Sequence, residues 1–215
     1  MDIVRKLKND LQFYANDMAD LIEGKSFYLS LKCSNKGIQD RPFAKWISNN
    51  FYYISIIEIV KFCIDGEQKD DKPFLSIIKT FKEKHQEIEK IRAKGKDTAI
   101  DIHKIFDRQK YVYNKDILKI ANILARYRKY RNKKIAHFTD VNISQPKIKQ
   151  ILKDITSLER LFSKYNKMLG EFYALDNEKY IKSYSIRIKK IIRKPKIRNT
   201  ETVYKLMKDI SGRKE

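Results

Sequence analysis

The chain has 215 residues, enough to bury a hydrophobic core in one large helical domain or in a domain with a tail. Its six Gly and four Pro supply too little turn chemistry for a many-stranded sheet, and long stretches without either residue favour helices. The 48 Lys and Arg exceed the 27 Asp and Glu by 21 charges, which predicts attraction to RNA, DNA or an anionic membrane.

The two cysteines, Cys33 and Cys63, form no C-x2-C pair and no cluster with histidine. The sequence therefore predicts neither a zinc site nor a disulfide framework, and we expect no metal and no cofactor. Residues 1–8 lack the continuous apolar core of a signal peptide, so a cytoplasmic location is expected.

Apolar residues at three- and four-residue spacing predict an amphipathic helix over residues 2–24, with Gly24 ending it. Residues 25–39 are interpreted as a connection, and Asp40 and Pro42 are typical of the start of the next helix.

Residues 43–64 contain no Gly or Pro and are apolar on nearly every face, which favours a buried helix over a strand pair because of the length. Glu58 and Lys61 interrupt the apolar run, so it is too short for a membrane span. A carboxylate on such a helix needs a cationic partner. Glu58 is expected either in a structural ion pair or as a supporting residue that orients Arg131.

The next predicted helix begins at Pro73 and continues to about Ala93, with His85 on its inward-facing stripe as a packed histidine. A short helix is expected over residues 98–107, where His103 is predicted to be exposed and has no assigned role.

A further helix is predicted from Asn114, which can cap it, with the stripe Ile117, Ile120, Ala121 and Leu124 facing inward. Continued at the same spacing, this stripe includes Arg128 and Arg131. An arginine on a buried stripe must meet a carboxylate, an interface or a ligand, so this stripe predicts a functional surface.

No acidic residue occurs between Asp116 and Asp140. This interval is either a phosphate-binding strip or a solvated face. Its cations are Lys119, Arg126, Arg128, Lys129, Arg131, Lys133 and Lys134.

Within this interval, Arg131, Asn132 and His137 are the residues with the most specific chemistry. A guanidinium can hold two phosphate oxygens, and a histidine that titrates near neutral pH can move the proton of a 2′-hydroxyl. Six residues of a regular α-helix rotate a side chain by about 240°, so Arg131 and His137 would diverge. Either the helix ends before His137 or a second chain completes the site.

The string Tyr130-Arg131-Asn132-Lys133-Lys134-Ile135-Ala136-His137, followed by Phe138-Thr139-Asp140, resembles the signature of the HEPN superfamily. It is similar in particular to the HEPN proteins of bacterial abortive-infection and toxin-antitoxin systems. The resemblance implies an all-α antiparallel helical bundle, a homodimer with both motifs in one cleft, and RNA cleavage without metal. Arg131 would then be the phosphate-binding arginine, Asn132 its polar companion and His137 the catalytic histidine. Independently of the resemblance, the run of cations predicts that Arg128, Lys133 and Lys134 bind RNA.

Some members of this family are regulated by adenylylation of a tyrosine two residues after the histidine. This chain has Thr139 at that position, which argues against the same regulation here.

Ser144, Gln145 and Pro146 begin the last predicted core helix, whose apolar stripe continues to Phe172. We assign residues 1–176 to the helical domain and residues 177–215 to a basic C-terminal extension. From Glu178 to Glu215 there are 13 basic and 4 acidic residues. The extension either follows RNA through Arg187, Lys189 and Lys190, with tyrosines for stacking, or docks a partner protein.

The sequence as a whole is interpreted as a metal-independent endoribonuclease toxin of a bacterial antiphage defence or toxin-antitoxin system. Its expected partners are RNA, a second copy of itself and an antitoxin protein such as a nucleotidyltransferase, with no membrane. The alternative is a non-catalytic RNA- or nucleotide-binding module within a larger assembly.

Overall fold

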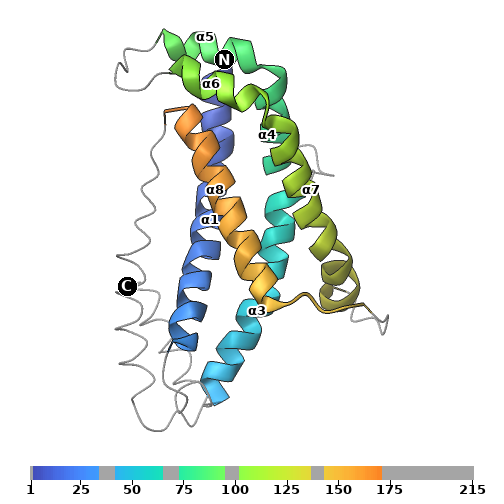
Figure 1. The fold of residues 1–215 in the computed structure, drawn as a ribbon. Helices are drawn as coiled ribbons and strands as arrows, with labels where there is room; N and C mark the ends of the chain where they lie inside the picture. Colours follow the sequence, from blue (N-terminus) through green and yellow to red (C-terminus); the bar gives the residue numbers. More distant parts are fainter. Residues whose placement is uncertain (1, 34–41, 65–72, 95–101, 137–142, 171–215) are drawn as a thin grey trace. The chain divides into compact units, whose positions relative to one another are not determined.

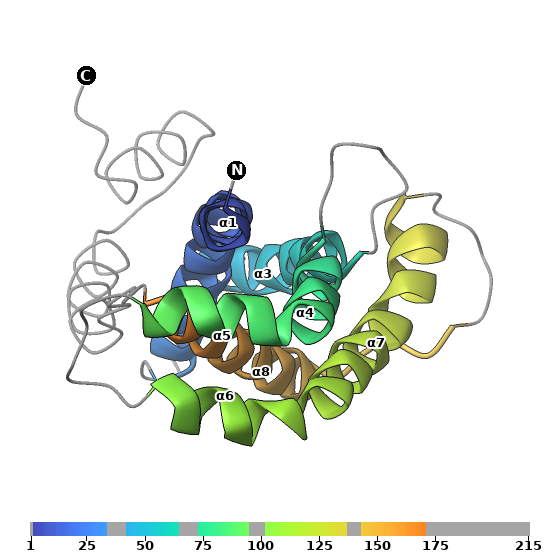
Figure 2. The same ribbon diagram turned by 90° about the horizontal axis from the view of Figure 1, so that it is seen from above.

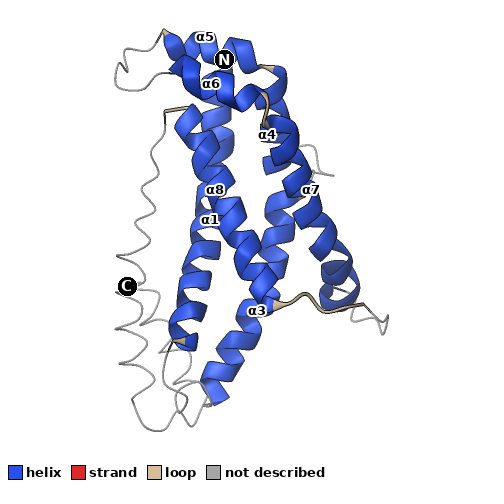
Figure 3. Cartoon of the chain, viewed as in Figure 1, coloured by secondary structure: helices blue, strands red, loops and turns tan. Residues whose placement is uncertain are grey.

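A computed structural model describes residues 2–33, 42–64, 73–94, 102–136 and 143–170 of the chain. Within these ranges the protein is all-α and contains no strand, as Figure 3 shows. The helices are α1 (Ile3–Lys32), α3 (Pro42–Cys63), α4 (Phe74–Glu83), α5 (His85–Ala93), α6 (Ile102–Lys110), α7 (Tyr113–Tyr130), the π-helical segment η1 (Arg131–Ala136) and α8 (Ile148–Met168). The all-α class predicted from composition is therefore confirmed.

The chain divides into two compact units. The larger unit comprises residues 1–22 and 52–175, and the smaller comprises residues 23–51 and 176–215. The expected domain boundary at residue 177 lies outside the described residues, as do the positions Arg187, Lys189 and Lys190.

In the larger unit, α4 packs along α7, and α8 contacts both α6 and α7. Helices α5 and α6 lie side by side across the end of the unit where α8 finishes (Figure 1), and the view from above shows the same arrangement (Figure 2). This topology places η1 and the start of α8 at one end of the unit and the end of α8 at the other.

Aromatic side chains fill the centre of the larger unit. The ring of Phe62 on α3 lies 4.8 Å from that of Phe74 on α4 and 6.2 Å from that of Phe162 on α8. Phe81 on α4 contacts Tyr165 on α8 at 4.9 Å. Buried aromatic pairs add about 0.5–1.5 kcal/mol each beyond their apolar area, so these rings hold α3, α4 and α8 together.

In the smaller unit, the Tyr28 ring stacks on Phe51 with centroids 4.9 Å apart, and Leu31 and Ala44 form a small buried cluster. The prediction that Gly24 ends the first helix is wrong, because α1 continues to Lys32. A Cβ atom at Gly24 would lie 3.3 Å from the Phe51 ring, so the glycine permits a close approach within the helix. Tyr28 and Leu31, which follow Gly24, are buried, and their burial stabilises the extended helix.

Two further boundaries differ from the sequence prediction. The helix expected from Pro73 to Ala93 is broken at Lys84, whose φ of −103° and ψ of 18° separate α4 from α5. Helix α7 begins at Tyr113, and Val112 rather than Asn114 occupies its N-cap position, without a side-chain cap. The starts at Pro42 and after Pro146 agree with prediction.

None of the described helices combines the length and the apolar character that a bilayer crossing requires. The side chains of Tyr53 and Ile54 on α3 are 45% and 56% exposed. The helix is therefore not buried on every face, although its sequence is apolar on nearly every face.

Candidate functional site

The buried face of α7 differs from the predicted one. It consists of Tyr113, Asp116, Ile120, Ile123, Tyr127 and Tyr130. Arg128 is exposed and Arg131 is half-buried, so the prediction that both arginines occupy a buried stripe is wrong. The physical reason is that tyrosines and an aspartate with satisfied polar atoms take the inward positions that the sequence pattern gave to Ile117, Ala121 and Leu124.

The cations of α7 fall on two flanks of the helix. At about 100° per residue, Lys115, Lys119 and Lys129 share one exposed flank, and Arg128 lies roughly 100° to 180° away from them. Arg131 directly follows α7 with helical backbone angles, so it neighbours Arg128 one turn on. The strip predicted from the sequence is therefore two surfaces, and Arg128 belongs with Arg131.

The residues Arg131–Ala136 form the π-helical segment η1. Such segments have hydrogen bonds from residue i to i+5, are rare, and occur frequently at functional sites. The regular α-helix thus ends at Tyr130, before His137. His137 itself lies outside the described residues.

Arg131 and Asn132 are joined directly. Nη1 of Arg131 donates a hydrogen bond to Oδ1 of Asn132 at 3.0 Å, and both side chains are half-buried. A guanidinium has five N–H donors, and this bond uses one of them. Asn132 therefore orients the arginine fork while most of its donors remain to grip an anion. Of the two lysines in η1 that were predicted to bind RNA, Lys133 is exposed and Lys134 is half-buried.

Tyr130 and Tyr52 hold the start of η1 in place. Tyr130 is 7% exposed and packs edge-on against Tyr52 of α3, with ring centroids 6.3 Å apart. The Tyr52 hydroxyl donates to the backbone oxygen of Pro146 at 2.9 Å. Burial, followed by the interaction with Tyr130, raises the pKa of Tyr52 and keeps it protonated as a donor. Tyr52 thus contacts the chain on both sides of residues 137–142.

Asp154 of α8 anchors α7 one turn before the motif. This carboxylate is 3% exposed and accepts hydrogen bonds from Nε and Nη2 of Arg126 at 3.1 and 2.8 Å. It also accepts from the Tyr127 hydroxyl at 2.7 Å and from Gln150 at 3.0 Å. Burial and the bond to Asp154 raise the pKa of Tyr127. Arg126 is therefore bound within the protein, although the sequence placed it among the phosphate-binding cations.

The sequence analysis missed Asp154, yet the pattern contains a signal for it. Asp154 stands between Ile151 and Ile155 on the inward stripe of α8, where an acidic residue needs a cationic partner. The Tyr52 and Tyr130 pairing had no comparable signal, because their separation in sequence hides it.

The cation paired with Glu58 is Lys61, with Oε2 and Nζ 3.7 Å apart. Lys61 also bonds Asp17 at 3.1 Å, and this bond is the main reason that the pKa of Lys61 is raised. The ion pair expected for Glu58 is thus present. The alternative role of Glu58, which is to orient Arg131, stays a prediction.

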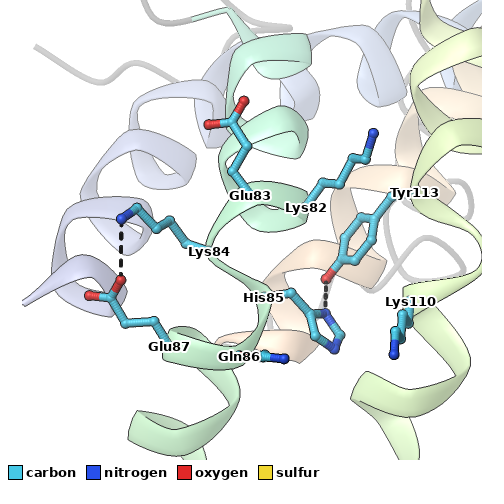
Figure 4. Close-up of a pocket in the computed structure, with 8 residues that line it drawn as sticks. All are labelled: Lys82, Glu83, Lys84, His85, Gln86, Glu87, Lys110 and Tyr113. Carbon is cyan, nitrogen blue, oxygen red and sulfur yellow. Dashed lines mark hydrogen bonds and ion pairs between the residues drawn. The ribbon is translucent and has the colours of Figure 1, made fainter.

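His85 lies in a separate cavity of about 520 Å³ at the junction of α4 and α5 (Figure 4). Its Nδ1 atom is 2.9 Å from the Tyr113 hydroxyl, and Glu89 lies 3.9 Å from its Nε2 atom. Burial raises the pKa of Tyr113, so this tyrosine keeps its proton and can donate it to His85. The expectation of a packed, satisfied histidine is confirmed. His103 is exposed, as predicted, and bonds Glu89 at 2.7 Å.

Among the described side chains, no group of three His, Cys, Asp or Glu is arranged to hold a metal ion. Comparisons with protein-family models, with curated proteins and with solved structures found no match for this chain.

Proposed function

We propose that this protein is a metal-independent endoribonuclease similar to the HEPN toxins. The observation that carries the proposal is the bond between Arg131 and Asn132 within a π-helical segment, six residues before a histidine. Arg128 adds a second guanidinium one turn earlier on the same flank. Paired arginines and an amide next to a titratable histidine suit the charge that develops during phosphodiester cleavage.

In the proposed mechanism, His137 removes the proton of the 2′-hydroxyl as a general base. The 2′-oxygen attacks the adjacent phosphorus, and the bond to the 5′-oxygen of the next nucleotide breaks. The leaving 5′-oxygen takes a proton from solvent water, giving a 2′,3′-cyclic phosphate and a 5′-hydroxyl end. Arg131 stabilises the phosphorane charge through its fork of donors, and Asn132 holds the arginine and helps to place the phosphate.

A homodimer is part of the proposal, with each protomer contributing a motif to one cleft. The exposure of Arg128 removes the argument that a buried arginine requires an interface. The dimer is now supported by the family resemblance, with the phosphates of bound RNA separating the arginines of the two protomers. Light scattering at micromolar concentration tests it, and a fully active monomer would contradict it.

The biological setting is proposed on the same basis: a cytoplasmic toxin of a bacterial abortive-infection or toxin-antitoxin pair, held inactive by an antitoxin protein such as a nucleotidyltransferase. Expression without the partner should then stop growth. Co-expression of the product of the neighbouring gene should restore it.

The second candidate function is a non-catalytic RNA-binding module. The flank formed by Lys115, Lys119 and Lys129 favours it, because exposed cations on one helix face can bind phosphates without any chemistry. Both functions predict RNA binding, so binding alone does not separate them.

The deciding experiment is incubation of the full chain with labelled single-stranded RNA in excess EDTA. The ribonuclease predicts multiple turnovers and products with 2′,3′-cyclic phosphate ends. RNA recovered intact after stoichiometric binding would support the module and overturn the ribonuclease.

A further inference from the structure

A second cavity is lined by residues of α6 and α8. These two helices meet near the end of the larger unit that is opposite to η1 (Figure 1). The cavity volume of about 550 Å³ falls within the range of about 300–1,000 Å³ that is usual for ligand sites. Neither the family signature nor the strip on α7 includes its residues. We refer to it as the α6–α8 groove.

Cations dominate the lining of the α6–α8 groove. Arg108 comes from α6, and Arg160, Lys164 and Lys167 come from α8, against the single carboxylate Glu159. On α8 these cations stand at i, i+4 and i+7, so one face of the helix presents them toward Arg108. Like charges at this spacing destabilise a helix by about 0.2–0.5 kcal/mol per pair.

The buried network beneath the groove neutralises only one of these cations. The Lys164 ammonium pairs with Asp116, which is 6% exposed and also accepts hydrogen bonds from Tyr165 at 2.8 Å and from Gln109 at 3.0 Å. Within the described part of the chain, no carboxylate pairs with Arg108, Arg160 or Lys167. These three side chains are exposed and face an open cavity.

The donor set suits phosphate better than a carboxylate or a sugar. Two guanidinium groups on opposite walls can each grip two oxygens, Lys167 adds a point charge, and the Ser163 hydroxyl can donate between them. Gln109 lines the bottom of the groove, and its amide nitrogen already donates hydrogen bonds to Asp116 and Tyr165. The cations are therefore the groups that would bind the ligand.

We propose that the α6–α8 groove is a second anion-binding site, which takes a ligand with two or more adjacent phosphate groups. Such phosphates come either from the backbone of an RNA strand or from a free polyphosphate such as a nucleoside triphosphate. The inference does not depend on RNA cleavage at Arg131, because the groove shares no residue with that motif.

The test is calorimetric titration of the full-length protein with two probes, inorganic triphosphate and a short 2′-O-methyl RNA. The methyl group prevents 2′-oxygen attack, so binding is measured without cleavage. The test variant is Arg108→Ala with Arg160→Ala. The matched control is Arg5→Ala with Lys6→Ala, which removes the same charge from two exposed positions on α1.

The site predicts that the groove variant binds at least one probe about tenfold or more weakly than the control variant does. Loss of triphosphate binding assigns the groove to free polyphosphates, whereas loss of RNA binding alone assigns it to the RNA backbone. Arg160→Lys, which keeps the charge and the fold, should bind with intermediate strength because it lacks the planar fork. Equal binding by the groove and control variants, or no binding of either probe by the wild type, would overturn the proposal.

Discussion

Arg131 donates a hydrogen bond from Nη1 to Oδ1 of Asn132 at 3.0 Å, which ties together two neighbouring residues of the π-helical segment. Neighbours on a regular α-helix point about 100° apart, and η1 departs from that geometry. The hydrogen bond to Asn132 therefore sets the direction of the Arg131 guanidinium.

Replacing Asn132 by Ala should slow RNA cleavage by about fivefold, since one hydrogen bond of roughly 1 kcal/mol is lost while the arginine remains. Asn132→Asp should be slower still, because a carboxylate would compete with phosphate for the same donors. Single-turnover cleavage rates of the two variants check this. Equal rates for wild type and Asn132→Ala would show that Asn132 does not orient the arginine.

Asp154→Asn should destabilise the fold by about 2–4 kcal/mol. The substitution keeps the shape of the side chain but removes the negative charge that Arg126, Tyr127 and Gln150 bind. It also places an NH₂ group where one carboxylate oxygen accepted hydrogen bonds from these donors. Urea denaturation provides the measurement. Asp107→Asn on the exposed face of α6 is the control and should stay within roughly 0.5 kcal/mol of wild type. Similar midpoints for the two variants would contradict the anchoring role of Asp154.

Long apolar stripes in the sequence predicted the elements that they dominate. The stripe of α8 from Ile151 to Leu169 is buried as expected, except for the half-buried Leu152. The length of α3 follows from the absence of Gly and Pro after Pro42. The helix end predicted at Gly24 was wrong because a glycine can also allow an aromatic ring to approach the helix backbone closely.

The candidate site was less predictable than the fold. The face of α7 was misassigned because Tyr127 and Asp116 are buried with their polar atoms satisfied, and single-sequence periodicity cannot show such pairing. The pairing of Arg126 with Asp154 spans 28 residues, so no local pattern reveals it. The bond between Arg131 and Asn132 is local, and the motif chemistry pointed to both residues.

The buried tyrosines predict a loss of stability at alkaline pH. Burial is the largest cause that raises the pKa of Tyr52, Tyr113, Tyr127 and Tyr165 above the ordinary value of about 10. Because the folded pKa exceeds the unfolded one, their contribution is complete below about pH 10 and is lost as the pH rises above it.

Tyrosinate absorbance followed together with helical circular dichroism checks this prediction. Some of the 13 tyrosines should ionise while the helices persist, and the four with a raised pKa should ionise only as the helices unfold. Ionisation of all the tyrosines in one step near pH 10, with the helical signal unchanged, would contradict their burial.

Gly170→Ala should destabilise the protein by about 1–3 kcal/mol. Gly170 has a φ of 80°, which strains any L side chain, and an added Cβ atom would clash with the Arg92 guanidinium. That arginine donates from Nε to the Met168 oxygen at 3.2 Å and caps the end of α8. The matched control is Gly24→Ala, where higher helix propensity offsets a 3.3 Å contact with Phe51. Thermal unfolding should separate the two variants, and equal melting temperatures would be the contrary result.

Catalysis by His137 together with Arg131 is tested by measuring RNA cleavage in EDTA by His137→Ala and Arg131→Ala. Both variants should bind RNA and keep the helical spectrum of the wild type. Their cleavage rates should fall by at least about 10²- to 10⁴-fold, the usual worth of a general acid or base. Arg131→Lys should recover little, because an ammonium lacks the planar fork. His85→Ala should keep cleaving, since His85 serves packing. A folded His137→Ala protein that cuts RNA at the wild-type rate in EDTA would show that His137 is not the catalytic histidine.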